Sequence, residues 1–256
     1  MTGLDVRVRR EEICNIAAQR GSIGVAELAR RFGVSEVTLR TDLQALESEG
    51  RLTRVHGGAI SSYKAYCDMS FKQRFSANER QKRAIAAAAA RQIEDNDCVM
   101  LNAGTTTLFV LKALSGRKGL KIVTNSLAVA LEANANTDFG VTLLGGCVNA
   151  EYQFSYGDDA LRQLRGYRAD KLILSVDGVQ HEAGLSTYYD REAELCRLML
   201  GLARVRIVAA DFTKIGRTAM TLIAPPNSAD LLITDGGAPS NELSALKRAG
   251  LRIITA

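Results

Sequence analysis

Residues 25–50, VAELARRFGVSEVTLRTDLQALESEG, contain two short amphipathic segments with only a few residues between them. Gly33 can adopt the left-handed backbone that a sharp turn needs, and Ser35 is a favoured residue for capping the helix that follows. In each segment the apolar residues recur at helical spacing and form one stripe: Val25, Leu28, Ala29 and Phe32 in the first, and Leu39, Leu43 and Leu46 in the second. This stretch therefore predicts a helix-turn-helix whose leucines face a shared core.

The outward face of the second helix carries residues suited to DNA. Because the leucines point inward, short polar and basic side chains remain on the other side. Such a helix can enter a major groove about 12 Å wide, where Arg and Thr side chains reach bases and phosphates. The predicted contacts from this helix and its cap are Ser35, Val37, Thr38, Arg40 and Thr41.

The next residues, RLTRVHGGAI (51–60), predict two short strands, 51–55 and 59–60, around a His-Gly-Gly turn. This hairpin would form a wing, with Arg51, Arg54 and His56 lying along the DNA backbone. The alternative for Arg54 and His56 is a solvated turn without a DNA contact. A further helix is predicted for residues 8–19.

The positive charge of the chain is concentrated in its first third. The net charge is +5, from 33 Lys and Arg against 28 Asp and Glu. Residues 1–83 hold 15 of these basic residues and 10 of the acidic ones, whereas residues 84–256 hold 18 of each. A basic end joined to a neutral body favours an anionic polymer as the partner of that end.

Composition excludes several classes of protein. A chain of 256 residues that is 46% hydrophobic and 24% charged is typical of two globular domains, not of a disordered or collagen-like chain. No apolar run approaches the ~20 residues that span a bilayer, and the first residues are charged, so we expect a cytoplasmic protein without a membrane partner. The five cysteines are dispersed, which predicts buried small side chains and neither a disulfide framework, a metal site nor a cofactor.

After residue 84, apolar runs alternate with amphipathic ones. Strands are predicted at 98–102, 120–124, 141–144, 171–176, 205–210, 231–234 and 251–255, and helices at 108–114, 127–134, 159–164, 192–203 and 242–249. This alternation predicts an α/β domain with a mainly parallel sheet covered on both faces. Ligands of such folds bind in loops at the carboxyl ends of the strands.

The loop from Asn102 to Thr107 follows one strand and opens a helix. Gly104 lets the backbone approach an anion, Thr105, Thr106 and Thr107 supply hydroxyls, and the helix start supplies N–H groups. This pattern suits a phosphate monoester, whereas the absence of a Walker or GxGxxG motif argues against ATP or a dinucleotide. The alternative is a threonine-rich helix cap.

Other loops supply candidate partners for the rest of the ligand. Asp177, Gly178 and Glu192 offer acceptors for sugar hydroxyls, and Lys214 and Arg217 offer positive charge for a phosphate. The same strand-then-small-polar pattern occurs at Asn125, Ser126, Gly145 and Gly146. For His181 a structural or solvent role is favoured.

These motifs resemble the DeoR-type family of bacterial transcriptional regulators. In the first third the resemblance lies in Val34-Ser35, Thr38 to Leu43, Arg54 and His56 to Ala59. In the remainder it lies in Gly104-Thr105-Thr106, Thr124-Asn125, Gly145-Gly146, Asp177-Gly178, Asp190 with Glu192 or Glu194, and Asp211 to Arg217. Thr41 stands where relatives usually have Arg, and Asn102 where they commonly have Asp.

The resemblance implies a winged helix-turn-helix at residues 1–60, a linker at 61–77 and an α/β domain at 78–256 related to ribose-phosphate isomerases and sugar-phosphate deaminases. It implies a regulator, with repression favoured, of a carbohydrate catabolic operon. Its partners would be operator DNA, a phosphorylated sugar that releases it, and further copies of the chain in a dimer or tetramer. The alternative is an isomerase or deaminase with a fused DNA-binding domain, in which Asp177, His181 and Glu192 transfer protons.

Overall fold

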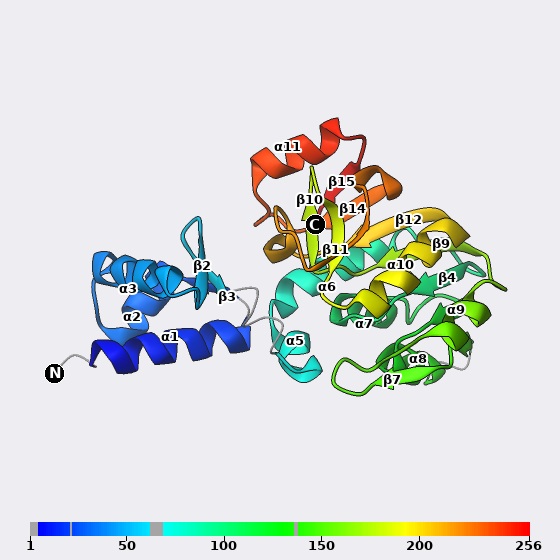
Figure 1. Ribbon diagram of the computed structural model, residues 1–256, viewed down its shortest axis with the longest axis horizontal. Coiled ribbons are helices and arrows are strands. Elements are labelled where there is room, and N and C mark those ends of the chain that lie inside the picture. The colour runs from blue at the N-terminus through cyan, green and yellow to red at the C-terminus, as the bar shows by residue number, and fades with distance from the viewer. Residues whose placement is uncertain (1–4, 21, 62–68, 136–137) are drawn as a thin grey trace. The chain divides into compact units, whose positions relative to one another are not determined.

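The computed structural model describes residues 5–20, 22–61, 69–135 and 138–256. Contacts between Cα atoms divide the chain into two compact units, Met1–Glu79 and Arg80–Ala256. Each unit has its own hydrophobic core. Figure 1 shows the helices and strands of both units.

The first unit is a winged helix-turn-helix, as predicted. Its elements are α1 (Val6–Arg20), β1 (Ser22–Gly24), α2 (Val25–Phe32), α3 (Glu36–Ser48), β2 (Leu52–Val55), β3 (Gly58–Ser61) and α5 (Phe71–Ser76). Gly33 has a φ of 64°, which makes the turn between α2 and α3, and the Ser35 hydroxyl accepts a hydrogen bond from the Thr38 N–H at 3.1 Å. The strands form an antiparallel sheet in the order β1-β3-β2. The predicted leucine stripe, Leu39, Leu43 and Leu46, is buried.

Helix α1 starts before the predicted residue 8 because Asp5 caps it. The Asp5 carboxylate accepts a hydrogen bond from the Arg7 N–H at 2.9 Å, and the Asp5 carbonyl accepts one from the Arg9 N–H at 2.9 Å. Asp5 thus supplies acceptors for N–H groups that have no intrahelical partner in the first turn of a helix. The inner face of α1 buries Ile13, Ile16 and Ala17 against α2 and α3.

Part of the segment expected as a linker is helical. Residues 62–68 of that segment lie outside the described residues, but α5 follows them. The Ser70 side chain accepts from the Gln73 N–H, and the Gln73 side chain accepts from the Ser70 N–H, which forms a capping box. The Ser-x-x-Gln spacing is the sequence signal for this helix. With six residues, the helix is too short to show a repeating apolar pattern.

The second unit is built on a seven-stranded parallel sheet, which confirms the predicted fold class. The strands are ordered β15-β14-β12-β9-β4-β5-β6, and each neighbouring pair is parallel. They comprise β4 (Cys98–Leu101), β5 (Lys121–Thr124), β6 (Gly140–Leu143), β9 (Ala169–Leu174), β12 (Ala203–Ala209), β14 (Leu231–Thr234) and β15 (Arg252–Thr255). All seven correspond to predicted strands.

The helices of this unit alternate with those strands. They are α6 (Glu79–Ala90), α7 (Thr105–Ala113), α8 (Leu127–Asn134), α9 (Asp158–Leu164), α10 (Asp190–Leu202), α11 (Ser240–Arg248) and the short 3₁₀ turns η1 (Phe212–Lys214) and η2 (Pro226–Ser228). Five of the α-helices coincide with the predicted ones to within a few residues. Helix α7 begins at Thr105 rather than residue 108, because the threonines form its first turn.

Two small antiparallel sheets were not predicted. One contains β10 (Gly178–Gln180), β11 (Gly184–Thr187) and β13 (Thr221–Ala224), and the other is the hairpin of β7 (Cys147–Asn149) and β8 (Phe154–Tyr156). Each strand is three or four residues long, which is too short for an alternating pattern to be recognised.

The parallel sheet brings the predicted ligand loops to one edge. Strands β4, β5, β9 and β12 run in the same direction, so the residues that follow their carboxyl ends share that edge. These residues are Asn102–Thr107, Asn125–Ser126, Ser175–Gly178 and Ala210–Lys214. The strands themselves are buried at Met100, Leu172 and Val208, among others.

Candidate functional site

The outer face of α3 presents the predicted DNA contacts to solvent. The Ser35 and Thr38 hydroxyls lie 2.9 Å apart, and the Thr41 hydroxyl donates to the Val37 carbonyl at 3.1 Å. Val37 is 70% exposed although it is apolar. An exposed valine methyl beside threonine methyls suits contact with the methyl group of thymine.

The three predicted arginines each pair with a carboxylate. These contacts are Arg40 Nη2 to Glu36 Oε2 at 2.6 Å, Arg51 Nη2 to Glu11 Oε2 at 2.7 Å, and Arg54 Nε to Glu47 Oε2 at 2.7 Å. The side chains of all six residues are at least 35% exposed, and exposed pairs of this kind contribute only about 0–1 kcal/mol. DNA phosphates can therefore replace the carboxylates.

The Arg54–Glu47 pair connects strand β2 of the wing to α3, the helix predicted to enter the major groove and here called the recognition helix. The backbone N–H of Arg54 donates to Glu47 Oε1 at 2.9 Å, in addition to the guanidinium contact. That backbone bond is the main reason why the pKa of Glu47 lies below its ordinary value, and the guanidinium bond is the next. His56 lies in the turn of the wing and is exposed.

A buried acid that sequence reasoning missed fixes the recognition helix. Asp42 lies on the inner side of α3, only 2% exposed, and accepts from Arg9 Nε at 2.7 Å and from Arg10 Nε at 2.9 Å. Both arginines belong to α1. The signal in the sequence is the position of Asp42 beside Leu39 and Leu43, on the stripe that faces the core.

In the second unit, Gly104 is required by close packing at the start of α7. A Cβ atom at Gly104 would lie 2.7 Å from Ser175 Cβ and 2.8 Å from Ser175 Oγ. The Thr107 hydroxyl lies 2.8 Å from the Gly104 carbonyl and 2.9 Å from the Asn102 carbonyl. It therefore donates its hydrogen bond to the backbone of the loop itself. Thr105 and Thr106 form the first turn of α7, where N–H groups have no intrahelical acceptor.

Asn102 joins the ends of β4 and β9. Its Nδ2 donates to the Ser175 carbonyl at 2.9 Å, while its Oδ1 accepts from the Ser175 N–H at 2.7 Å. The amide donates and accepts at once, which a carboxylate at this position could do only after taking up a proton. Its Nδ2 also lies 3.5 Å from Glu192 Oε1.

Asn125 and Ser126 support the Asn102–Thr107 loop from the neighbouring strand. The Asn125 side chain accepts from the Ala103 N–H at 3.0 Å and donates to the Ser155 carbonyl at 3.2 Å. The Ser126 hydroxyl caps α8.

The glycines after β6 contact another part of the unit. Gly145 donates to the Gln163 side chain at 3.0 Å, and a Cβ at Gly146 would lie 2.4 Å from the Tyr156 carbonyl oxygen. These contacts are with α9 and β8, not with the Asn102–Thr107 loop.

Asp177 and Glu192 meet at one hydroxyl. Thr187 Oγ1 lies 3.1 Å from Asp177 Oδ2 and 3.1 Å from Glu192 Oε2, and the Tyr188 N–H donates to Asp177 Oδ2 at 3.0 Å. Both carboxylates are 9% exposed. Thr187, which the sequence did not reveal, thus bridges the two acceptors predicted from the sequence.

The loop with Lys214 and Arg217 lies next to Gly178. A Cβ at Gly178 would lie 2.5 Å from the Arg217 carbonyl oxygen, and the Gly216 N–H donates to the Val179 carbonyl at 2.8 Å. Lys214, on η1, is 5% exposed.

Asp235, which follows β14, supports the turn η1 from the adjacent strand. Its Oδ1 accepts from the Phe212 N–H at 2.7 Å, and its Oδ2 accepts from the Gly237 N–H at 3.1 Å. Burial, and next the charge of Asp211, raise the pKa of Asp235 above its ordinary value.

His181 is hydrogen-bonded to Glu242. Its Nδ1 lies 2.9 Å from Glu242 Oε2, and its backbone N–H donates to Glu242 Oε1 at 2.7 Å. These bonds join the β10–β11 hairpin to α11, which favours a structural role.

The expectation of buried cysteines holds only in part. Cys196 is buried, and burial raises the pKa of its thiol well above the ordinary value, but Cys14 and Cys98 are partly exposed and Cys147 is exposed. Cys147 is exposed because it lies on β7 of the small hairpin. Cys67 lies outside the described residues.

Over the described ranges, no group of three or more His, Cys, Asp and Glu side chains could hold a metal ion. In the same part of the chain, no helix combines the length and the apolar character needed to cross a membrane.

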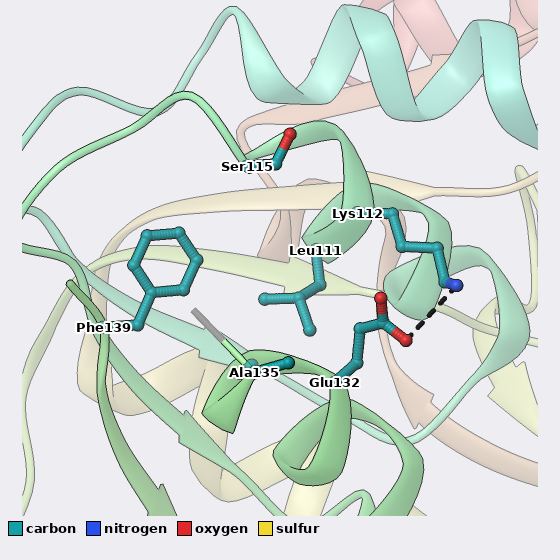
Figure 2. A pocket seen from close by; sticks show the side chains of 7 residues that line it. Leu111, Lys112, Ser115, Glu132, Ala135 and Phe139 are labelled. Carbon is teal, nitrogen blue, oxygen red and sulfur yellow. Dashed lines mark ion pairs between the residues drawn. The ribbon is translucent and has the colours of Figure 1, made fainter. Parts of the chain in front are cut away.

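A separate cavity of about 390 Å³ lies at the other end of α7, between α7 and α8. Figure 2 shows Leu111, Ser115 and Phe139 around it, with Lys112 and Glu132 paired at 3.2 Å. The Asn102–Thr107 loop is at the amino end of α7 and this cavity at its carboxyl end, so the two are distinct.

Comparison with known proteins covers both units. Residues 9–65 match the DeoR-like helix-turn-helix domain, and residues 77–236 match the DeoR C terminal sensor domain. A protein of Escherichia coli O157:H7 named as a candidate aga operon transcriptional repressor is 36% identical, over 96% of this chain and 92% of its own. The lactose phosphotransferase system repressor of Lactococcus lactis is 33% identical, over 89% and 90% of the two chains.

The chain is also similar in part to solved structures. The ribose 5-phosphate isomerase of Plasmodium falciparum is 16% identical, with a TM-score of 0.39, and the match covers 55% of this chain and 52% of that chain. The relatives similar over their whole length are named as transcriptional repressors and not as enzymes, which confirms the prediction of a regulator. With a helix-turn-helix and a sensor domain that both match, the chain belongs to the DeoR family of transcriptional regulators.

Proposed function

We propose that this protein represses a carbohydrate catabolic operon and that a phosphorylated sugar releases it from the operator. It acts as a homo-oligomer, a dimer or a tetramer, in which recognition helices from two copies read adjacent half-sites. The DNA contacts come from Ser35, Val37, Thr38, Arg40 and Thr41 on α3 and its cap, and from Arg51, Arg54 and His56 in the wing.

The observation that carries the proposal is the chemistry gathered at one edge of the parallel sheet. The first turn of α7 offers N–H groups for a phosphate, and Asp177 and Glu192 offer acceptors for hydroxyls. Lys214 on η1 and Arg217, whose backbone lies against Gly178, are the candidates to add positive charge for the phosphate. A phosphate at one end and a polyol at the other describe a sugar phosphate.

Release requires that the sugar phosphate bind the DNA-free arrangement more tightly than the DNA-bound one. Near-complete switching, from 1% to 99% of one state, takes about 5.5 kcal/mol of differential binding. A ligand that bridges the Gly104–Thr107 loop and Lys214 would provide such a difference if only one of the two arrangements lets both contact it.

The experiment is fluorescence anisotropy of the full chain on duplexes from the promoter region of its neighbouring genes, with a panel of sugar phosphates and the matching unphosphorylated sugars. We expect specific binding that one or more sugar phosphates abolish and the free sugars do not. Lack of any specific duplex would overturn the DNA-binding part, and lack of any response to phosphorylated sugars would overturn the sensing part.

Two variants separate the roles of the two units. Arg40→Ala is expected to weaken DNA binding by about 1–3 kcal/mol, the range for a lost base contact, with sugar binding unchanged. Lys214→Ala is expected to leave DNA binding intact and to raise the sugar phosphate concentration needed for release. Loss of both activities in either variant would indicate misfolding.

A further inference from the structure

A cluster of aromatic rings packs against the Asn102–Thr107 loop. Tyr152 and Phe154, at 6% and 2% exposure, form a small core with Ala103 of that loop, and Tyr189 packs against it. Ring centroids lie 4.7 Å apart for Tyr152 and Tyr189, and 5.9 Å apart for Phe154 and Tyr189. The cluster is therefore part of the wall beside the loop proposed to bind phosphate.

Tyr189 is held rigidly and yet remains partly accessible. Besides its contacts with Tyr152 and Phe154, its ring meets that of Tyr188 edge-on at 4.8 Å. Tyr188 and Tyr189 are only partly buried, in contrast to the two inner rings. A ring fixed by three neighbours loses little conformational freedom when a ligand covers it, which favours binding.

The same short segment holds the proposed acceptors for sugar hydroxyls. Thr187 bridges Asp177 and Glu192, and the Tyr188 N–H donates to Asp177. Tyr189 directly follows these residues and precedes the first turn of α10, where Glu192 lies. An aromatic ring, two carboxylates and a helix amino terminus thus surround one part of the sheet edge.

We propose that Tyr189 stacks on one face of the sugar ring, so that the effector is a cyclic sugar phosphate and not an open-chain one. This inference rests on the proposed function. A pyranose in its chair form presents a face of C–H groups, which carry partial positive charge and are attracted to the negative face of an aromatic ring. An open-chain polyol phosphate also offers a phosphate and hydroxyls, but no such face.

The proposal makes Tyr189 the residue that selects ring form. If the contact with the sugar face is as strong as a contact between two aromatic rings, it corresponds to about twofold to tenfold in affinity. Selection for ring form arises here because the carboxylates and the phosphate loop bind both forms equally, while only the ring form covers Tyr189.

The test uses hexose 6-phosphates (glucose, galactose and mannose) and the alditol 6-phosphate made from each by reduction, which cannot cyclise. Binding to the full chain is measured by calorimetry and by release from DNA. For the hexose phosphate that binds best, we expect up to about tenfold weaker binding of its alditol phosphate. Tyr189→Leu should abolish this preference, Tyr189→Phe should keep it, and Tyr167→Leu, which removes a ring packed on the main core, should leave it unchanged.

Three outcomes would overturn the inference. The first is equal affinity of the wild type for a hexose phosphate and its alditol phosphate, and the second is an unchanged preference in a Tyr189→Leu variant that still binds DNA. In both cases sugar phosphate sensing survives and only the role of Tyr189 fails. The third is that none of the six phosphates binds, which would overturn the inference. If the wider panel of sugar phosphates also fails, the proposed effector class is overturned as well.

Discussion

The carboxylate of Asp42 in α3 lies 2.7 Å from the guanidinium Nε of Arg9 in α1, and both side chains are at most 6% exposed. Arg10 adds a second contact to the same carboxylate at 2.9 Å. A recognition helix is useful only if its orientation is fixed, and leucine packing alone permits small rotations. The two directed ion pairs restrict those rotations because each needs a particular geometry.

We expect Asp42→Asn to destabilise the helix-turn-helix. Asparagine keeps the shape of the side chain but removes the negative charge, which leaves Arg9 as a buried cation; loss of one member of a buried pair typically costs about 3–5 kcal/mol. Amide hydrogen exchange across α3 should become faster, and DNA affinity should fall. Asp159→Asn, which removes an exposed partner of Arg162, is the matched control and should change neither. Unaltered exchange in α3 would contradict this account.

Glu47→Gln is expected to strengthen DNA binding. Glu47 holds Arg54 through its guanidinium and its backbone N–H, so neutral glutamine frees the arginine for a phosphate and removes a nearby negative charge. The dependence of the logarithm of affinity on the logarithm of salt concentration should become steeper by up to about one unit. Anisotropy titrations at several salt concentrations measure this, with Glu182→Gln in the other unit as the control. Weaker binding would mean that the ion pair orients Arg54 productively.

Gly104→Ala is expected to impair sugar phosphate sensing while DNA binding persists. The φ of Gly104 is 165°, which any residue adopts, so the penalty comes from packing, mainly against Ser175 and less closely against the Thr107 hydroxyl at 3.3 Å. Overpacking of this kind costs about 1–3 kcal/mol. Ser175→Gly removes the two atoms that the new methyl group would approach most closely, so the double variant should regain much of the sensing. Failure of the double variant to recover any response would show that the close approach to Ser175 is not the cause.

Asp235→Asn should alter how stability depends on pH. The raised pKa of Asp235 means that the folded state binds this proton more tightly than the unfolded chain does, so its contribution to stability falls as pH rises from the ordinary value of 3.8 through the folded pKa. The variant lacks this loss, and its stability relative to the wild type should increase across that window and then level off. Chemical denaturation between acidic and neutral pH measures the trend.

Asp230→Asn provides a control of opposite sign. The guanidinium of Arg206 lowers the pKa of Asp230, so the wild-type contribution is present above the ordinary pKa and is lost as pH falls through the folded one. Relative to the wild type, this variant should therefore become less stable as pH rises. Parallel trends in the two variants would contradict the assignment.

The parts of the fold that sequence revealed are those governed by local periodicity. The leucines of α3 and the apolar runs of the seven parallel strands each repeat with the period of their own element, so they could be recognised without knowledge of neighbours. Gly33 and Ser35 likewise act within one turn. The strands β7, β8, β10, β11 and β13 were missed because each is held in place by its partner strand and not by its own pattern.

The features of the candidate sites also fall into those that the sequence predicts and those that only the structure shows. The chain alone determined the helix-turn-helix, the parallel sheet and the loops where chemistry is expected, because these follow from spacing along the sequence. Only the tertiary structure decided that Asp42 ties α3 to α1, that Thr187 joins Asp177 and Glu192, and that Tyr189 borders Ala103. Such contacts join residues of different elements that no local period brings together, so which side chains meet depends on how the packed elements are arranged in three dimensions.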